Sequence, residues 1–359
     1  MSGVAADLRV VVVGGGVVGV ACALAFARRG VAVELREARD ALGLAASGTN
    51  SGILHTGFDS KPGELETELI LRAGQLRPAL LATLGVPFDE RGAVLTPRTG
   101  AERETVAALA ANGRGNGVEV AVGDDGALLV PGEGVTDPVA FTLALAAAAE
   151  AHGAVIRLGT PVTAPVDADV IVNAAGLGAG RVARLFGDDS FDVHPRKGEF
   201  FVFDVAPPPR ILLPVPTSRT KGVLVFGTLD GRTVAGPTAV DLDAEDWTVR
   251  PAARAEILAK AVAMHPALDG VEPVFAYAGL RPAGRDGANY VVRASEADPH
   301  LLHAAAIRST GLTAAPAIAE RVVALAGLEG APEAELRAGA APPPSATPWW
   351  RRTAERLAA

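Results

Sequence analysis

The sequence has little cysteine and few aromatic residues, and both shortages limit what the protein can be. Cys22 is the single cysteine among 359 residues. This excludes an intramolecular disulfide and a cysteine-based metal cluster, and it is typical of a reducing cytoplasm. We therefore expect a cytoplasmic protein without a bound metal. Aromatic residues make up 4% of the chain and hydrophobic residues 49%, so we expect a large core packed mainly from small aliphatic side chains.

The chain also lacks a basic excess and a convincing membrane-spanning run. Its net charge of -8 argues against a general nucleic-acid-binding protein, which needs a basic face. Residues 10–27 carry no charge and match the length of a short transmembrane helix, but the stretch contains four glycines within six residues. A strand, a glycine turn and a helix explain it better, so we expect no transmembrane segment and no nucleic-acid partner.

The N-terminal segment LRVVVVGGGVVGVACALAFARRGVAVELRE has the pattern of a dinucleotide-binding unit. Its valine run, Val10–Val13, predicts a strand of a parallel sheet that is buried on both faces. A helix is expected from about Val17 to Arg29. A second strand, Val31–Leu35, then leads to Glu37.

The turn between the first strand and the helix has the spacing G-x-G-x-x-G. Gly14 permits the tight turn, Gly16 lets a pyrophosphate approach the backbone, and Gly19 lets the helix pack closely on the strand. Glu37, about twenty residues further on, can accept hydrogen bonds from both hydroxyls of an adenosine ribose. A carboxylate there disfavours NADP and leaves NAD or FAD.

The next segment, ALGLAASGTNSGILHTGFDSKPGELE, favours FAD. A nicotinamide enzyme would continue with further strand–helix units, whereas this segment has too many glycines for a helix and few β-branched residues for a strand. The small residues 45–48 suit a loop along a second phosphate and a ribityl chain. Gly52 and Gly57 bracket Ile53–Thr56, where the backbone can pack against a flat ring.

This segment resembles the FAD-dependent oxidoreductases of the D-amino-acid-oxidase-like superfamily. The nearest branch is that of glycerol-3-phosphate dehydrogenases and L-2-hydroxyglutarate oxidases, which carry Asn-Ser-Gly, two hydrophobic residues, histidine, a small residue and glycine at the flavin. Five later segments resemble the same family in the same order, and together they cover most of residues 8–325. They are ADVIVNAAGLGAGRVARLFG (168–187), HPRKGEFFVFD (194–204), GRTVAGPTA (231–239), YAGLRPAGRD (277–286) and STGLTAAPAIAERV (309–322).

The resemblance implies an α/β fold: a Rossmann-like FAD-binding domain of the glutathione-reductase type and a smaller α+β substrate domain with a mixed or antiparallel sheet. The expected FAD-binding domain comprises residues 1–82, 138–192 and 276–331. The substrate domain comprises residues 83–137 and 193–275, and residues 332–359 form a proline-rich linker and a tail. Strands are expected at Val170–Val172, Phe200–Val205, Gly222–Gly227, Thr233–Ala235 and Leu302–Ala305.

A last helix is expected over Ala315–Ala326, with Pro316 in its first turn and its N-terminus directed at the flavin. The residues expected to contact FAD lie in four places. These are the glycine turn at 14–19, the segment 41–66, which we call the flavin loop, the region of the expected strand at 170–172, and the loop before the last helix. They are Gly14, Gly16, Val17, Val18, Gly19, Glu37, Ala38, Ala46, Ser47, Asn50, Ser51, Gly52, Ile53, Val162, Ala174, Ala175, Gly176, Arg281, Gly311, Leu312 and Thr313.

Three residues are candidates for substrate chemistry. The resemblance implies that Arg281 binds the substrate anion, because its planar fork suits a carboxylate or a phosphate. A structural ion pair with Asp286 or Glu272 is the alternative. Lys197 is a second candidate for contacting the anion or the flavin.

His55 is the best candidate for a base, since its ordinary pKa suits proton transfer near neutrality. It has two other interpretations, a hydrogen bond to the flavin or to the loop, and a covalent attachment point for the flavin.

The expected reaction is oxidation of a CH–OH group in a small anionic substrate, a 2-hydroxy acid such as 2-hydroxyglutarate or glycerol-3-phosphate, with the hydride passing to flavin N5. No cysteine-rich iron–sulfur extension is present, so oxygen, a quinone or a carrier protein is expected to accept the electrons. An amine or amino-acid oxidase, an electron-passing subunit of a larger complex, and a tailoring enzyme with an unusual substrate remain open.

The tail carries Trp349 and Trp350. It either docks on the body of the protein or touches a membrane or partner protein.

Overall fold

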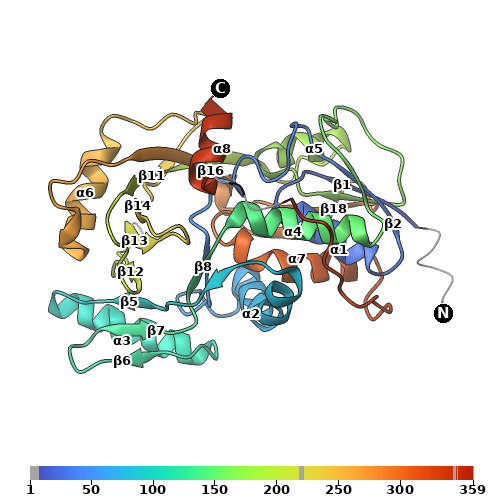
Figure 1. Cartoon of the computed structure of the whole chain (residues 1–359). Helices are drawn as coiled ribbons and strands as arrows, with labels where there is room; N and C mark the ends of the chain where they lie inside the picture. Colours follow the sequence, from blue (N-terminus) through green and yellow to red (C-terminus); the bar gives the residue numbers. More distant parts are fainter. Residues whose placement is uncertain (1–7, 218–221, 343–344, 346, 359) are drawn as a thin grey trace.

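The valine run near the N-terminus forms an inner strand of a six-stranded sheet, as a computed structural model of the chain shows (Figure 1). The structure describes residues 8–217, 222–342, 345 and 347–358. The strand order is β17-β18-β10-β1-β2-β9, and every neighbouring pair is parallel except β17 with β18. The strands are β1 (Arg9–Val13), β2 (Ala32–Arg36), β9 (Val155–Arg157), β10 (Val170–Asn173), β17 (Val291–Ala294) and β18 (Leu301–Ala305).

Alternate residues of β1 pack on opposite sides of this sheet. Val10 and Val12 belong to the largest core cluster, which also holds apolar residues of α1 (Val17–Ala27), α2 (Leu65–Leu84), α4 (Pro138–Ala151) and α7 (Gly311–Leu325). Val11 and Val13 pack in a separate cluster with Val182 of α5 (Ala179–Leu185). Burial on both faces explains why the strand reads as an unbroken apolar run.

A second sheet forms the other part of the molecule, at the left of Figure 1. Its strand order is β15-β11-β14-β13-β12-β5-β7-β6, and β16 pairs with the long β11. Helix α6 (Ala253–Met264) packs on β13 and β14, and α3 (Gly100–Gly115) lies between β5 and β6 in the chain. The strands are β5 (Ala93–Leu95), β6 (Ala121–Val122), β7 (Leu128–Val130), β11 (Val193–Phe203), β12 (Ile211–Leu213), β13 (Leu224–Gly227), β14 (Thr233–Gly236), β15 (Val240–Asp241) and β16 (Phe275–Gly284).

A small three-stranded sheet bridges the two parts. It consists of β3 (Ile53–Leu54), β8 (Gly134–Thr136) and β4 (Phe88–Asp89), with β8 in the middle. The flavin loop, for which the sequence predicted no regular structure, therefore contains one short strand. Single-turn helices are found at Gly176–Gly178, Pro266–Leu268 and Arg285–Gly287.

The mixed architecture confirms the expected α/β fold, and each expected strand is present, although β11 begins at Val193, seven residues before the expected start at Phe200. One detail of the prediction was wrong. Helix α7 begins at Gly311, so Pro316 is its sixth residue and not part of the first turn. Because proline has no N–H, Pro316 cannot donate to the carbonyl of Leu312 inside the helix. Strand β16, which the prediction placed with the FAD-binding part, pairs with β11 along its whole length and so is hydrogen-bonded into the second sheet.

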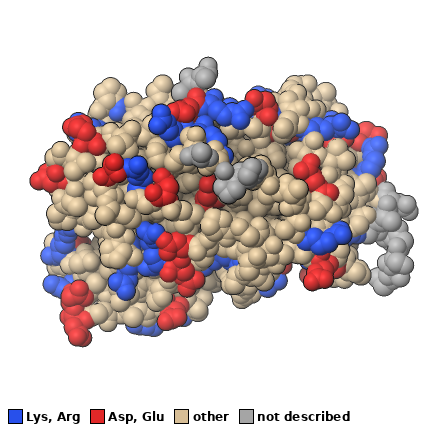
Figure 2. All heavy atoms as spheres, viewed as in Figure 1, with Lys and Arg blue, Asp and Glu red and all other residues tan. Residues whose placement is uncertain are grey.

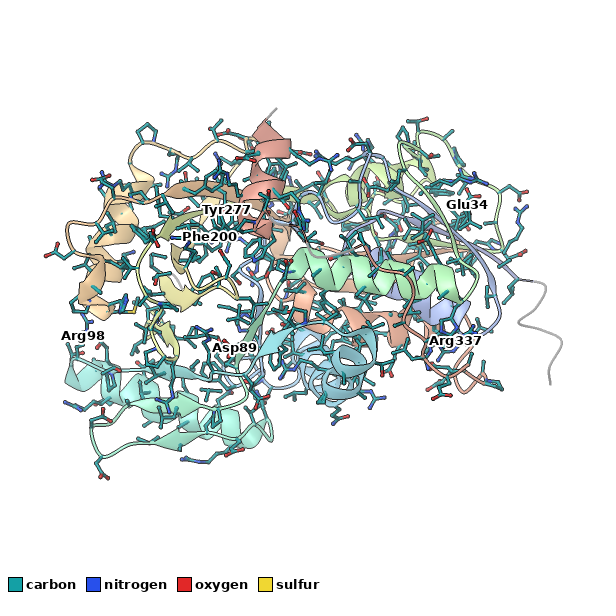
Figure 3. The ribbon with its side chains drawn as sticks, viewed as in Figure 1. Glu34, Asp89, Arg98, Phe200, Tyr277 and Arg337 are labelled. Atoms are coloured by element: carbon teal, nitrogen blue, oxygen red, sulfur yellow. The ribbon has the colours of Figure 1, made fainter. Side chains whose placement is uncertain are left out.

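The tail ends in helix α8 (Trp349–Ala358), which packs on β16 (Figure 1). Trp349 and Trp350 are buried, and the Trp349 ring meets Tyr277 edge-on at a centroid distance of 5.8 Å. Tyr277 in turn stacks on Phe200 (Figure 3). The tail therefore docks on the body of the protein, and its two indole rings are not presented to a membrane.

The surface carries charges of both signs, which are interspersed over the face in Figure 2. Among the helices in the described part of the chain, none combines the length and apolar character needed to cross a bilayer.

Candidate active site between the two sheets

A first cavity lies where the glycine turn, the flavin loop and the start of α7 meet at the carboxyl ends of the parallel strands. Its volume is about 320 Å³. Gly16 is the N-cap of α1 and makes no side-chain capping bond, and Ser47 accepts a hydrogen bond from the Val17 N–H at 3.0 Å. The positive end of the helix therefore faces the cavity through a glycine turn without obstructing side chains, which is the arrangement that binds a pyrophosphate.

The glycine turn needs its glycines for geometric reasons. Gly14 has a φ of +110°, and a Cβ there would lie 2.4 Å from the Ala174 carbonyl oxygen. A Cβ on Gly19 would lie 1.9 Å from the Gly14 carbonyl oxygen. Gly19 thus serves close packing of α1 on the turn, as the spacing predicted, and does not itself line the cavity.

Most of the predicted cofactor residues line this first cavity: Gly14, Gly16, Val17, Val18, Glu37, Ala38, Ala46, Ser47, Asn50, Val162, Ala174, Ala175, Gly176, Arg281, Gly311 and Leu312. The Glu37 carboxylate accepts hydrogen bonds from the Gly15 N–H at 2.6 Å and from the Arg39 N–H at 2.8 Å.

Three other predicted cofactor residues line neither cavity. The Gly52 carbonyl accepts from the Thr136 N–H, Ile53 is buried in the second core cluster, and the Thr313 hydroxyl accepts from the His55 N–H at 3.0 Å. These three residues hold the flavin loop in place by contacts outside the two cavities.

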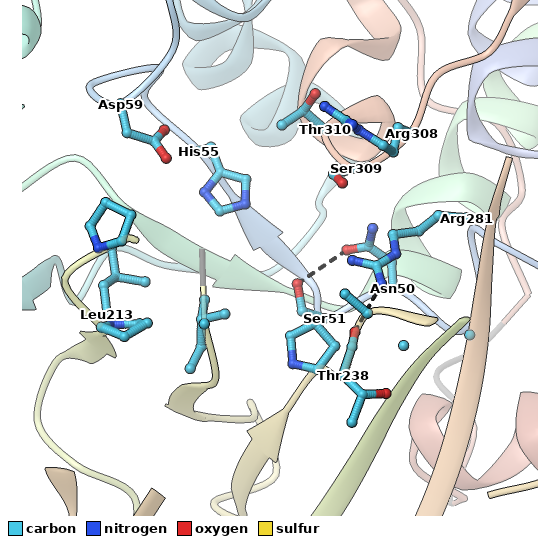
Figure 4. A pocket seen from close by; sticks show the side chains of 18 of the residues that line it. Asn50, Ser51, His55, Asp59, Leu213, Thr238, Arg281, Arg308, Ser309 and Thr310 are labelled. Atoms are coloured by element: carbon cyan, nitrogen blue, oxygen red, sulfur yellow. Dashed lines mark hydrogen bonds between the residues drawn. The ribbon is translucent and has the colours of Figure 1, made fainter. Parts of the chain in front are cut away.

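A second cavity of about 440 Å³ adjoins the first and lies between the two sheets. The two share Ala46, Asn50, Arg281, Arg308 and Ser309, so they form one continuous site. Ser51, His55 and Thr310 line the second cavity as well, and Figure 4 shows these side chains around it.

Arg281 lies on β16 where the two cavities meet. Its guanidinium donates to the carbonyl oxygens of Arg196, Lys197 and Thr238 at 2.9–3.2 Å. Within the described residues no carboxylate pairs with it, and Glu272, one of the two partners considered, is paired with Arg254. Burial and the neighbouring cations Arg196 and Arg308 lower the pKa of Arg281 to about 10. Arg281 is therefore still a cation at neutral pH, and its charge is available to an anionic ligand.

Two further arginines at this cavity were not identified from the sequence. Arg196 lies opposite Arg281 in the β11–β16 pairing and binds the Asp241 carboxylate through two contacts of 2.7–2.8 Å. Arg308 lies in the loop before α7 and is exposed. Arg308 could have been predicted as a site residue from the sequence, because it directly precedes the STGL motif at 309–312.

His55 projects from the end of β3, and its Nδ1 lies 3.0 Å from the Oε2 atom of Glu133. The Glu133 side chain is fully buried, and its Oε1 atom accepts from both the N–H and the hydroxyl of Thr56. A carboxylate at Nδ1 favours the tautomer that carries its proton there, which leaves Nε2 as the proton acceptor.

Glu133 was missed in the sequence. Its signal is a single acidic residue between two apolar strands, in ALLVPGEGVTDP. Because 78 residues separate it from His55 in the chain, no local pattern connects the two.

The structure does not support the prediction that Lys197 contacts the substrate or the flavin. Arg196 and Gly198 line the second cavity, but Lys197 points to the opposite face of β11. Its side chain is fully buried, and its ammonium binds Asp246 at 2.5 Å and the Thr248 carbonyl at 2.9 Å.

A buried hydrogen-bond chain holds the loop that precedes α7. The hydroxyls of Tyr290 and Thr310 lie 2.6 Å apart, and the Thr310 hydroxyl donates to Glu66 at 2.7 Å. Thr310 lines the second cavity, so this chain connects the cavity wall with helix α2.

Comparison with known proteins agrees with this geometry. Residues 9–325 match the family described as FAD dependent oxidoreductase, or DAO. The chain belongs to this family. FAD, and not NAD, is therefore its cofactor, and the protein is an FAD-dependent oxidoreductase.

Individual relatives are distant but similar over long stretches. The chain is 28% identical to a glycerol 3-phosphate oxidase of Mycoplasma pneumoniae, over 88% of this chain and 94% of that protein. It is 24% identical to an L-2-hydroxyglutarate dehydrogenase of Escherichia coli, over 64% of this chain and 63% of that one. The structure of L-alpha-glycerophosphate oxidase from Mycoplasma pneumoniae with FAD bound has a TM-score of 0.81 to this chain, at 25% identity, covering 93% of this chain and 96% of that one.

Proposed function

We propose that this protein oxidises the CH–OH group of a small anionic substrate, with the hydroxyl-bearing carbon held between His55 and the flavin. The observation that carries the proposal is the cationic Arg281, which lies beside the cofactor cavity and has no carboxylate partner among the described residues. Relatives named for glycerol 3-phosphate and L-2-hydroxyglutarate act on alcohols that carry an anionic group, which is consistent with this chemistry.

The first cavity fits FAD. The N-terminus of α1 and the Ser47 loop suit the pyrophosphate, and Glu37 is placed to turn toward the adenosine ribose. The start of α7 borders the place where the two cavities meet, and its positive end favours negative charge there. When bound, FAD supplies the acceptor for the hydride.

Arg281 binds and orients the substrate anion. Its backbone contacts fix the plane of the guanidinium without neutralising its charge. The two N–H groups of Nη1 are not used in these three contacts and can meet a carboxylate or a phosphate, which sets the direction in which the rest of the substrate points.

His55 takes the hydroxyl proton at Nε2. The Glu133 carboxylate holds the imidazole by Nδ1 and stabilises the positive charge that develops on the ring when the proton arrives. Glu133 does not touch the substrate in this proposal and acts as a positioning residue.

Anaerobic titration of the yellow holoprotein tests the proposal. Flavin absorbance is followed while 2-hydroxy acids, glycerol 3-phosphate and amino acids are added in separate experiments. Bleaching by a hydroxy compound supports the proposal. Bleaching by amino acids alone would assign the protein to the amine oxidases, and no bleaching by any of them would favour an electron-passing role.

The same preparation tests how FAD is held. Acid precipitation should release a yellow supernatant, because neither cavity requires a covalent bond. Colour that stays in the pellet would point to covalent attachment, with His55 the first residue to examine.

A further inference from the structure

The first cavity, which fits FAD, lies between helices from both faces of the first sheet. Helix α1 packs on one face, and its N-terminus opens into the cavity at Gly16. Helix α5 packs on the other face, where Val182 contacts the cluster of Val11 and Val13. The segment 174–178 joins β10 to α5 and lines the cavity. A ligand at the carboxyl ends of the strands therefore has α1 on one side and α5 on the other.

The wall that leads to α5 lies directly against the glycine turn. The Ala174 N–H donates to the Val13 carbonyl at 3.0 Å, and a Cβ on Gly14 would lie 2.4 Å from the Ala174 carbonyl oxygen. Arg181, in the first turn of α5, lines the same wall. Its Nη2 atom lies 3.3 Å from the position that a Cβ on Gly178 would take. Because Gly178 also lines the cavity, the guanidinium folds back toward the cavity wall.

Arg181 differs from the other arginines that line the first cavity and not the second. Arg36 binds Glu34 at 2.6 Å, and Arg39 contacts Glu245 at 3.7 Å. Across the described part of the chain, no carboxylate pairs with Arg181, and its side chain is exposed. Its positive charge is therefore available to a ligand in this cavity.

The diphosphate of FAD requires more positive charge than α1 supplies. It carries about two negative charges, whereas a helix N-terminus is equivalent to roughly half a positive charge. The N-cap Gly16 adds no charged group, and Glu37, which accepts from the Gly15 N–H, adds a negative one. Most of the diphosphate charge is then left without a counter-charge at α1. A guanidinium can provide it, because its planar fork meets a phosphate with two N–H donors.

We propose that Arg181 is a cofactor-binding residue, which supplies from α5 the counter-charge for the FAD diphosphate. The diphosphate is then held between the N-terminus of α1 and this guanidinium. The inference goes beyond the proposed function and does not depend on which substrate is oxidised. It predicts that Arg181 recognises the diphosphate and not the adenosine.

The affinity of the holoprotein for FAD tests the inference without any substrate. The holoprotein is diluted serially, free flavin is separated by ultrafiltration, and the dissociation constant of FAD is determined over a series of NaCl concentrations. Arg181→Gln should raise this constant roughly tenfold at low salt, the lower end of the contribution of a charged hydrogen bond, because the arginine is exposed. The difference should narrow as salt screens the charges. Arg181→Lys should recover part of the affinity, since it keeps the charge.

Arg184 provides the matched control. It lies on the same helix, pairs with Asp192 at 3.4 Å and lines neither cavity. Arg184→Gln removes the same charge from α5 and should leave the dissociation constant of FAD unchanged. An equal loss of affinity in both variants would reflect the net charge of the protein and overturn the inference. Circular dichroism shows that each variant is folded before the constants are compared.

ADP and adenosine locate the contact along the cofactor. Each compound is used to displace FAD from the holoprotein, and the ratio of the adenosine concentration to the ADP concentration at half displacement measures what the diphosphate contributes. Arg181→Gln should lower this ratio roughly tenfold. Weaker binding of both compounds at an unchanged ratio would place Arg181 at the adenosine, and an unchanged dissociation constant of FAD would mean that Arg181 only faces solvent. Either result overturns the inference and leaves the proposed function untouched.

Discussion

The two adjoining cavities differ in their walls. The cofactor cavity is built around the glycine turn and small residues such as Gly14, Gly16 and Ala174, although arginines also line it, whereas the substrate cavity is walled mainly by longer side chains such as His55, Leu213 and Phe226. Where the wall is backbone, N–H groups bind the ligand, and the lack of side chains lets the ligand come close to them. Where the wall is made of side chains, each residue adds a charge, a proton acceptor or an apolar surface. Substitutions should therefore act on cofactor binding in the first cavity and on reaction or selectivity in the second.

The largest effect is expected at Gly19. A Cβ there would lie 1.9 Å from the Gly14 carbonyl oxygen, whereas a Cβ on Gly74, also inside a helix, would meet nothing within 4 Å. Gly19→Ala should yield protein that does not retain FAD, because α1 must move away from the turn. Gly74→Ala should keep FAD and raise the free energy of unfolding by about 1 kcal/mol. Flavin absorbance and thermal unfolding measure both, and a yellow Gly19→Ala protein of unchanged stability would contradict this account.

His55→Ala should give the next largest effect, confined to the reaction. A general base contributes typically ~10²–10⁴-fold, so the rate of flavin reduction should fall by that factor while the substrate concentration at half-saturation changes little. Stopped-flow reduction at saturating substrate measures it. Unchanged reduction combined with loss of FAD would instead make His55 a cofactor contact.

Arg281→Lys and Arg281→Ala should both weaken substrate binding. Loss of one partner from a buried charge pair costs about 2–5 kcal/mol, or roughly 30- to several-thousand-fold in affinity. Lysine should recover little of this, since an ammonium on a flexible stem cannot keep the three backbone contacts of the guanidinium and also present two N–H donors to the anion. The flavin spectrum should stay intact while bleaching requires much more substrate. Normal half-saturation in both variants would place the anion site elsewhere, with Arg308 the next candidate.

Glu133→Gln should give the smallest effect and the most specific one. Its carboxylate favours the protonated form of His55, so its removal should lower the kinetic pKa of the base. The limb of the pH–rate profile that falls toward acid should move to lower pH, and the maximal rate should drop by roughly tenfold. Asp59 and Arg77 also lie near this histidine and are left in place. A loss of thermal stability with an unmoved limb would show that Glu133 only supports the loop.

The glycine turn of the cofactor cavity could be predicted from the sequence because its geometry is local, whereas the later segments that line the cavity were identified from the family resemblance. The spacing of Gly14, Gly16 and Gly19 directly encodes a turn and a close approach, and no distant residue is needed to recognise it. The substrate cavity could not be predicted to the same extent. Its members meet through long-range pairing: Arg196 lies opposite Arg281 in the register of β11 and β16, and Glu133 reaches His55 from another strand.

Lys197 shows what the sequence alone did not reveal, namely which face of its strand the side chain lies on. It was assigned to the site on its charge and its neighbourhood, yet side chains alternate between the faces of a strand. The cation that lines the cavity is the preceding residue, Arg196. Neighbouring residues of β11 therefore have different roles, because Arg196 faces the cavity and Lys197 faces the buried interior.

Helix α8 packs against a loop near the beginning of the chain. Thr353 packs directly on Gly48, since a Cβ on that glycine would lie 2.6 Å from the threonine methyl carbon, and Arg356 pairs with Asp40 at 2.6 Å. The loop at residues 40–48 is thus braced by a segment that lies 316 residues further along the chain at the Arg356–Asp40 pair. The cofactor site is therefore complete only when the glycine turn, the strand at 301–305, α7 and α8 have all assembled, so a substitution that undocks α8 should weaken the retention of FAD.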